Sequence, residues 1–278
     1  MKNIRFYIII FSIFAIFFVG GEYFFYKSIF EIIFLDVGQG DSAVIKTAEG
    51  KNIIIDGGPD NTLVYKLGQY IRWPDKNIDL FILSHPDADH LIGIIELLDR
   101  YSFKEIYITG INHKTPEYKF FLRKIQEQGI KVSFAHIKDE FIFGDLRIEK
   151  IYPKENFYGR EMSNANDSSL VLKVRYKNLS VLFTGDLEKE KQEELLKYNI
   201  KSDLLKFPHH GSLDSFSEEF LSTVQPDEVI ISVGENFFGH PSKKVLRYLE
   251  RNSVRYVTTQ ENGDVIFSFT DNKIIRKH

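Results

Sequence analysis

Four side chains able to bind a metal ion fall within residues 85–90 (HPDADH), and this cluster constrains the chain more than any other feature. Imidazole nitrogen and carboxylate oxygen are suitable ligands for hard and borderline divalent ions. The apolar run Asp79–Ser84 before the cluster predicts a buried strand, and Leu91–Tyr101 after it has helical spacing. A turn between the two lets alternate side chains converge. The simpler alternative is a polar loop in which an aspartate caps the helix.

Two later segments also place such side chains directly after apolar runs. Thr184-Gly185-Asp186 ends one run, although a Gly-Asp pair alone is common in turns. Phe207–Ser212 ends another and carries the adjacent histidines His209 and His210. Together with residues 85–90 these segments predict a dinuclear site, in which a bridging carboxylate holds two ions and water ionises near neutral pH.

The composition narrows the kind of metal site. The chain has 278 residues and no cysteine, so disulfides are excluded and any metal must be held by histidines and carboxylates. The formal net charge of −3 is unlike that of a protein that coats duplex DNA, although it is compatible with a local basic groove.

The order of the patterned segments predicts an α/β protein. Strand-like and helical stretches form two halves, which suggests two sheets packed together and covered on the outside by helices. The expected strands are Glu31–Val37, Ser42–Thr47, Lys51–Asp56, Asp79–Ser84, Glu105–Thr109, Lys131–Ala135, Leu146–Tyr152, Ser169–Tyr176, Leu179–Thr184, Asp203–Phe207, Glu228–Val233, Arg255–Thr258 and Asp264–Thr270. The expected helices are Asn61–Ile71, Leu91–Tyr101, Pro116–Gln128, Glu188–Lys197, Phe216–Val224 and Ser242–Asn252.

The N-terminal run Phe6–Tyr26 is apolar apart from Glu22, and Lys2 and Arg5 precede it. Because a helix needs about 20 apolar residues to cross a bilayer, we expect residues 1–29 to form a membrane anchor and residues 30–278 to form the folded domain. A cleaved signal peptide and a soluble helix are the alternatives. The positive-inside tendency places the basic residues in the cytoplasm and the folded domain outside it.

Taken together, the motifs resemble those of the metallo-β-lactamase-fold hydrolases, and among these the hydrolase domain of ComEC-type DNA-uptake (competence) proteins. The resemblance covers most of the chain after about Ile32. It implies a four-layer αββα sandwich with the metal site at one edge. The matching segments are Phe34–Ser42, Ile55–Gly58, His85–His90, Asn166–Ser169, Thr184–Asp186, Pro208–Ser212 and Gly239–Pro241.

The resemblance also implies a role for individual residues around two divalent ions, Zn²⁺ or Mn²⁺. One ion would be bound by His85 and Asp87, the other by Asp89 and His90, and Asp186 would bridge them. We favour His210 as a further ligand of the second ion and His209 as a phosphate contact or proton donor, with the reverse assignment open. The expected catalytic residues are Asp89 and His209, and the expected substrate contacts are Asn166, Ser168 and His240.

The chain departs from the usual family pattern, His-x-His-x-Asp-His, at the first ion. Asp87 stands in place of the second histidine, and Asn166–Ser169 occupies the region of the next histidine ligand. The first half of the site therefore gains oxygen ligands and loses nitrogen ligands. This change weakens the preference for Zn²⁺ in favour of Mn²⁺, and it disfavours the hydrolysis of antibiotics.

Structural roles compete with functional ones elsewhere. Gly38–Asp41 is expected to form a turn between strands, and Asp56 to hydrogen-bond the metal-binding loop from behind. Asn166–Ser168 either lines the pocket or forms a turn, and His240 either acts on the substrate or caps the next helix. His113 and His136 are expected at the surface.

These expectations favour phosphodiester hydrolysis by a membrane-anchored, metal-dependent enzyme. The resemblance suggests DNA as the substrate, degraded during uptake. With one candidate membrane span, the chain would need a separate DNA-uptake channel as a partner. The alternatives are a surface phosphoesterase acting on cell-wall or lipid-linked phosphodiesters, and an anchored binding domain without turnover.

Overall fold

The computed structural model describes residues 29–71, 74–136, 139–270 and 273–277. The expected anchor, residues 1–29, lies outside the described residues except for Ile29. Within the described residues, no helix combines the length and apolar character that a membrane span requires.

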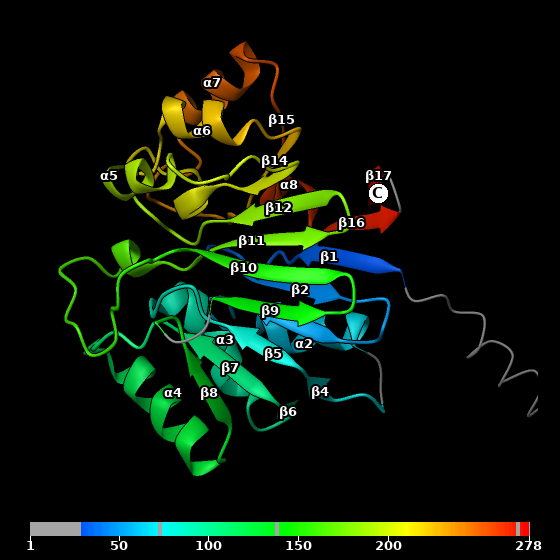
Figure 1. The fold of residues 1–278 in the computed structure, drawn as a ribbon, viewed down its shortest axis with the longest axis vertical. Coiled ribbons are helices and arrows are strands. Elements are labelled where there is room, and N and C mark those ends of the chain that lie inside the picture. The colour runs from blue at the N-terminus through cyan, green and yellow to red at the C-terminus, as the bar shows by residue number, and fades with distance from the viewer. Residues whose placement is uncertain (1–28, 72–73, 137–138, 271–272, 278) are drawn as a thin grey trace, which may run out of the picture.

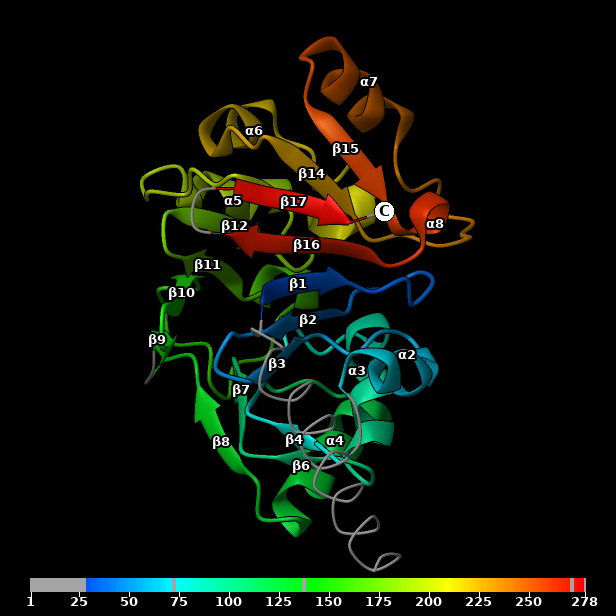
Figure 2. The same ribbon diagram turned by 90° about the vertical axis from the view of Figure 1, so that its right-hand side faces the viewer.

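Two large sheets form the centre of the molecule (Figures 1 and 2). The first contains, in spatial order, β17 (Lys273–Lys277), β16 (Val265–Thr270), β1 (Phe30–Phe34), β2 (Ala43–Lys46), β3 (Asn52–Ile55), β5 (Leu80–Ile82), β7 (Glu105–Ile108) and β8 (Lys131–Phe134). The second contains β15 (Arg255–Thr258), β14 (Glu228–Ile231), β13 (Leu204–Lys206), β12 (Leu179–Phe183), β11 (Val171–Tyr176), β10 (Leu146–Tyr152) and β9 (Glu140–Phe143). Strands β4 (Asn77–Ile78) and β6 (Ser102–Phe103) pair separately.

Helices cover the outer face of each sheet. The first sheet is covered by α2 (Thr62–Tyr70), α3 (Ala88–Leu97) and α4 (Pro116–Glu127), and the second by α5 (Lys189–Gln192), α6 (Glu218–Val224) and α7 (Lys243–Arg251). The remaining helical turns are α8 (Thr259–Asn262), η1 (Ala165–Ser168), η2 (Glu193–Leu195) and η3 (Pro208–Gly211). The expected four-layer αββα sandwich is confirmed.

Three apolar layers hold these elements together, one between the sheets and one beneath the helices on either side. Strand β1 shows how the sequence builds two layers at once. Ile32 and Phe34 face the other sheet, whereas Ile33 faces the helices, as the two-residue period of a strand requires. Between the sheets, the rings of Phe34 and Phe183 stack with centroids 5.4 Å apart.

Strand direction explains why the polar motifs meet. Strands β3, β5, β7 and β8 run parallel in the first sheet, and β12 to β15 run parallel in the second. Carboxyl ends of parallel strands share one edge of a sheet, where ligand sites of α/β folds lie. The segments that follow β5, β12, β13 and β14 contain motifs predicted to bind metal or substrate, and the segment that follows β3 contains Asp56.

Most predicted elements are present, with differences in their bounds. Helix α3 begins at Ala88 rather than at Leu91, so Asp89 and His90 lie in its first turn. Asp87 occupies the N-cap position, but among the described residues its side chain accepts no capping hydrogen bond. Capping therefore does not account for the carboxylate of Asp87. Strands β9 and β17 were not predicted.

Candidate metal centre

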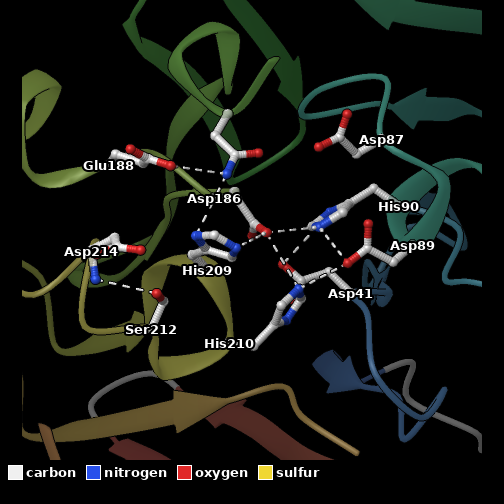
Figure 3. Close-up of polar contacts among 12 residues, drawn as sticks. Asp41, Asp87, Asp89, His90, Asp186, Glu188, His209, His210, Ser212 and Asp214 are labelled. Carbon is white, nitrogen blue, oxygen red and sulfur yellow. Dashed lines mark hydrogen bonds and ion pairs between the residues drawn. The ribbon is translucent and has the colours of Figure 1, made fainter. Parts of the chain in front are cut away.

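Four potential ligands converge between the two sheets (Figure 3). They are Asp89 and His90 from α3, Asp186 after β12 and His210 after β13, and their ligand atoms lie within 4.8 Å of one another. The Nε2 atoms of His90 and His210 are each 3.3 Å from Oδ2 of Asp186, and His210 Nε2 is 3.2 Å from Oδ2 of Asp89. These are the residues predicted to surround the second ion.

His90 is held from behind by Asp56. The Nδ1 atom of His90 is 3.0 Å from Oδ2 of Asp56, whose other oxygen accepts a 2.7 Å hydrogen bond from the amide of Ser84. A carboxylate accepts a hydrogen bond from Nδ1–H and leaves Nε2 directed at the site, the usual arrangement behind a metal-binding histidine. The structure thus places Asp56 where the sequence suggested, behind the loop.

A turn in an unusual backbone conformation carries the two adjacent histidines. His209 and His210 both have left-handed φ values, of 49° and 52°, a conformation that costs non-glycine residues energy and clusters at functional sites. His210 Nδ1 lies 2.9 Å from the carbonyl oxygen of Ser232. Because a carbonyl can only accept, Nδ1 carries a hydrogen, and Nε2 is the atom that faces the carboxylates of Asp89 and Asp186. His209 Nε2 is farther from the cluster, 3.9 Å from Oδ2 of Asp186.

Asp186 is fixed by the segment that departs from the family pattern. Its amide donates a 3.0 Å hydrogen bond to Oγ of Ser169. Gly185 has a φ of +51°, and a Cβ there would lie 2.9 Å from the side chain of Ser169. Glycine therefore lets the chain turn tightly enough to direct the Asp186 carboxylate at both imidazoles.

His85 and Asp87 form a separate pair beside this cluster. His85 Nε2 is 3.6 Å from Oδ2 of Asp87, and the His85 ring lies 4.2 Å from that of His90. Neither residue belongs to the groups of three or more close ligand atoms found among the described residues. The carboxylate of Asp87 also faces His113, whose Nε2 is 3.9 Å away. His113 therefore has a neighbour at the site that the sequence did not suggest.

A buried lysine and a buried aspartate form the floor of the centre. Lys206, at the end of β13, contacts Asp41 directly, and its Nζ is 3.6 Å from Oδ1 of Asp186. Lys206 is 2% exposed and Asp41 5%. Asp41 Oδ1 lies 3.4 Å from Nδ1 of His210. The sequence pattern predicts a turn at Asp41 and does not single out Lys206.

These contacts shift the ionisation of the central groups. Burial opposes the charged form of Asp186, but His210, His90 and Lys206 outweigh it and hold its pKa well below the usual range. Burial also opposes protonation of His90 and His210, yet the carboxylates, above all Asp186, raise both pKa values well above the usual range. The centre therefore favours bound positive charge. Protons supply this charge in the metal-free protein, and a divalent ion competes with them for the imidazole nitrogens.

The donor set fits a metal ion. Across the described part of the chain, few buried side-chain atoms lack a hydrogen-bond partner, and His85 Nε2, His90 Nε2, Asp186 Oδ1 and Asp41 Oδ1 are among them. Buried polar atoms without partners are rare in folded proteins and often indicate a ligand. Neutral imidazole nitrogens and carboxylate oxygens in this proportion suit Zn²⁺ or Mn²⁺.

The three predicted substrate contacts lie in different environments. Asn166 borders the centre, with Nδ2 3.5 Å from His209 Nδ1 and 3.3 Å from Oε1 of Glu188. The ring of His240 lies 5.4 Å from that of His209. Ser168 is fully buried and donates to the carbonyl of Ala165 within its own turn, so this conformation offers no support for a substrate contact there.

The fold and the site together define a member of the metallo-β-lactamase superfamily, whose family model matches residues 35–235. The chain belongs to this family. Among curated proteins it is 32% identical over 261 residues to ComE operon protein 3 of Bacillus subtilis, covering 86% of this chain and 33% of that protein. It is 28% identical to Recombination protein 2 of Haemophilus influenzae, covering 89% of this chain and 30% of that protein. Its matches thus include proteins of the competence type, and it spans about a third of their length.

Solved structures support the same fold. The metallo-β-lactamase fold protein YhfI from Bacillus subtilis superposes with a TM-score of 0.54 at 14% identity, covering 86% of this chain and 100% of that one. A diphosphatase from the PhnP family superposes with a TM-score of 0.51 at 12% identity, covering 86% and 98%. At such identities the likeness is one of fold.

Proposed function

We propose that this chain is a membrane-anchored, metal-dependent phosphodiesterase that hydrolyses DNA at the centre formed by Asp89, His90, Asp186 and His210. The convergence of these four side chains on one point is the observation that carries the proposal. The replacement of a ligand histidine by Asp87 makes the centre rich in oxygen, which suits Mn²⁺ and phosphate chemistry. The competence-type names of the relatives favour DNA over other phosphodiesters.

Each residue has a defined part in the proposed reaction. Asp89, His90 and His210 would hold one ion, His85 and Asp87 another, and Asp186 would bridge the two. When bound, two divalent ions supply Lewis-acid polarisation of the phosphoryl group and hydroxide near neutral pH. Asp56 keeps the Nε2 atom of His90 aimed at the ion through the contact at Nδ1.

His209 would act on the phosphate rather than hold the ion. Its side chain is 23% exposed, whereas that of His210 is 2% exposed. Burial lowers the pKa of His209, so at neutral pH it is an uncharged imidazole that can donate one hydrogen bond. Asn166 Nδ2 and the ring of His240 border it. Together these groups would position a phosphodiester over the centre.

We propose that the domain lies on the outer face of the cell membrane, next to a separate channel that takes up DNA. Lys2 and Arg5 before the apolar run Phe6–Tyr26 support this orientation. The competence-type names of the relatives support a role in DNA uptake. Protease digestion measures the orientation directly. The protease is added to intact cells and to cells whose outer surface has been opened so that it reaches the membrane. Digestion of the domain in the opened cells would support the outer position, and continued protection there would contradict it.

Hydrolysis by the full-length chain, purified in detergent and loaded with Mn²⁺ or Zn²⁺, tests the activity. We expect cleavage of a labelled single-stranded oligonucleotide and of bis-p-nitrophenyl phosphate. Asp89→Ala and His90→Ala should each lower kcat/KM by ~100-fold or more, because even residues behind a metal ligand contribute 10–100-fold. His136→Ala removes an exposed histidine outside the centre and should leave the rate unchanged.

The choice of substrate is tested with the same preparation. Cleavage of glycerophosphodiesters with DNA left intact would instead favour a phosphoesterase of cell-wall or lipid-linked substrates. No hydrolysis of any of these diesters, with either metal, would contradict the enzymatic proposal.

A further inference from the structure

The loop of residues 234–241, between β14 and α7, packs closely against two loops of the metal centre, one containing Gly38 and the other Gly211. A Cβ on Gly234 would lie 2.4 Å from the carbonyl carbon of Gly38, in the segment that supplies Asp41. At the other end, a Cβ on Gly211 would lie 2.6 Å from Cβ of Pro241. Such close approaches require glycine and fix the position of the loop beside the metal centre.

Asn236 holds the loop in one conformation. Its amide group donates to the carbonyl oxygens of Gly234 and His240, at 2.9 and 2.7 Å. Its carbonyl oxygen accepts from the amides of Phe238 and His240, at 3.1 and 3.0 Å. Four hydrogen bonds from one side chain organise the residues on either side of Phe237 and Phe238.

The two phenylalanines at the tip of this ordered loop point into solvent. Phe237 is 107% exposed and Phe238 76%, and among the described residues they are the adjacent pair of large exposed apolar side chains. A fixed loop that presents two such side chains to water indicates a surface that binds an apolar partner.

A series of rings connects this tip to the metal centre. The ring of Phe238 lies 5.8 Å from that of His240, and the ring of His240 lies 5.4 Å from that of His209. His209 in turn reaches Oδ2 of Asp186 at 3.9 Å. A ligand bound over the centre therefore lies near the ring of Phe238, which is connected to His209 through the ring of His240.

The charge around the loop suits a phosphate backbone. Lys243 and Lys244 are exposed in the first turn of α7, directly after the loop, and Glu235 is the exposed acid within it. Basic side chains that follow a backbone and aromatic rings on which bases stack are the two features of single-strand binding sites. A partner protein would cover the rings without using the phosphate chemistry of the centre beside them.

We propose that Phe238, with Phe237 beside it, stacks on an unpaired base of a single-stranded nucleic acid whose phosphodiester lies over the metal centre. This inference rests on the proposed function and names its substrate as single-stranded. In a duplex, stacking on the neighbouring base pairs covers both faces of each internal base, so a duplex cannot use the phenyl rings in this way. The rings would place the strand, and the metal centre would cleave it.

Binding without turnover tests this proposal separately from the activity. Fluorescence anisotropy is measured on the full-length chain in detergent, with EDTA and low salt, using a labelled oligothymidylate and an abasic strand of equal length. Phe238→Ala should weaken binding of the thymidylate strand about tenfold, the equivalent of about 1.4 kcal/mol and within the range for one stacked base. Binding of the abasic strand should not change, and Phe238→Tyr should retain the parent affinity.

Phe120→Ala is the matched control, because Phe120 is an exposed phenylalanine on α4, a helix that covers the other sheet. An unchanged affinity of Phe238→Ala for the thymidylate strand, or an equal loss for both strands, would overturn the proposal. Hydrolysis of DNA together with either result would leave the proposed function standing. Binding that depends on Phe238 in a protein without hydrolytic activity would support the stacking surface and contradict the enzyme.

Discussion

Lys206 and Asp41 balance the charge beneath the centre. The ammonium group of Lys206 contacts Asp41 and lies near Asp186, with all three side chains buried. Burial opposes the charged form of Lys206, but Asp41 and Asp186 outweigh it and raise its pKa above the usual value. A buried charge is tolerated only when it is paired, so the removal of Lys206 leaves two carboxylates close together without this cation.

Lys206→Met should therefore lower the free energy of unfolding by about 3–5 kcal/mol, the usual cost of leaving a buried charge unpaired. Urea denaturation of the metal-free protein measures it. Lys173→Met is the matched control, since Lys173 is also a buried strand lysine but donates to the carbonyl of Asn199. An equal loss in both variants would show that Lys206 has no special role in the centre. The double variant Lys206→Met, Asp41→Asn should recover part of the stability.

The sequence reveals some of these residues and hides others, for a physical reason. His90, Asp186 and His210 stand directly after apolar strands, so their pattern predicts a shared site. Asp41 stands in a Gly-rich turn, which suggested a structural role, and its partner lies in a different sheet. The available signal was a lysine within the apolar segment Leu204–Phe207, because a lysine is almost never fully buried unless it is paired.

Helix α3 is the element that positions two of the four central ligands, and glycine allows its approach. A Cβ on Gly93 would lie 2.0 Å from the carbonyl oxygen of Gly57 and 2.6 Å from that of Asp60. The amide of Gly57 also donates to the carbonyl of His90 at 2.6 Å. The Asp56-Gly57-Gly58 segment and α3 thus pack backbone to backbone, and Asp89 and His90 depend on that contact.

Gly93→Ala should force α3 away from this segment. Overpacking costs about 1–3 kcal/mol, and the shift should also weaken Mn²⁺ binding. Thermal denaturation and a Mn²⁺ titration measure the two effects. Gly68→Ala provides the control within α2, since a Cβ there meets nothing within 4 Å and alanine favours a helix over glycine by about 1 kcal/mol. Unchanged stability and metal affinity in Gly93→Ala would refute the packing argument.

The elements themselves were largely predictable, and the exceptions share a cause. Strands with apolar runs, such as Leu80–Ile82 and Leu204–Lys206, were recognised because they are buried on both faces. Strand β17 (Lys273–Lys277) lies at the edge of its sheet, and its exposed residues Lys273, Ile275 and Lys277 alternate with half-buried Ile274 and Arg276. Its strand character comes from pairing with β16, which a local pattern does not reveal. The exposure of Phe237 and Phe238 likewise follows from the tertiary structure.

At the scale of the whole molecule, the centre joins the two halves. Asp89 and His90 come from the half with the first sheet, and Asp186 and His210 from the half with the second. A metal ion held by all four would therefore cross-link the sheets. At a concentration about 100 times its Kd, such an ion stabilises a protein by about 2.7 kcal/mol, equivalent to about 5–10 °C in Tm for a chain of this size.

The size of this stabilisation should depend on pH. His90 and His210 have pKa values raised above the usual 6.5, so their protonation stabilises the metal-free fold below pH 6.5. That contribution is lost as the pH rises through the raised pKa values. Because a metal ion needs neutral imidazoles, the increase in Tm with Mn²⁺ should be larger at pH 8 than at pH 5.5. Differential scanning fluorimetry measures both curves, and an equal increase at the two pH values would contradict this coupling.

The metal content of the purified chain tests the central claim most directly. Elemental analysis combined with equilibrium dialysis against Mn²⁺ or Zn²⁺ should find two ions per chain, with the tighter ion bound by Asp89, His90, Asp186 and His210. Asp186→Asn should weaken the binding of both ions, because Asp186 is proposed to bridge them, whereas the exposed substitution Asp145→Asn should change neither. A chain that binds neither ion, or an Asp186→Asn variant with unchanged metal affinity, would contradict the account.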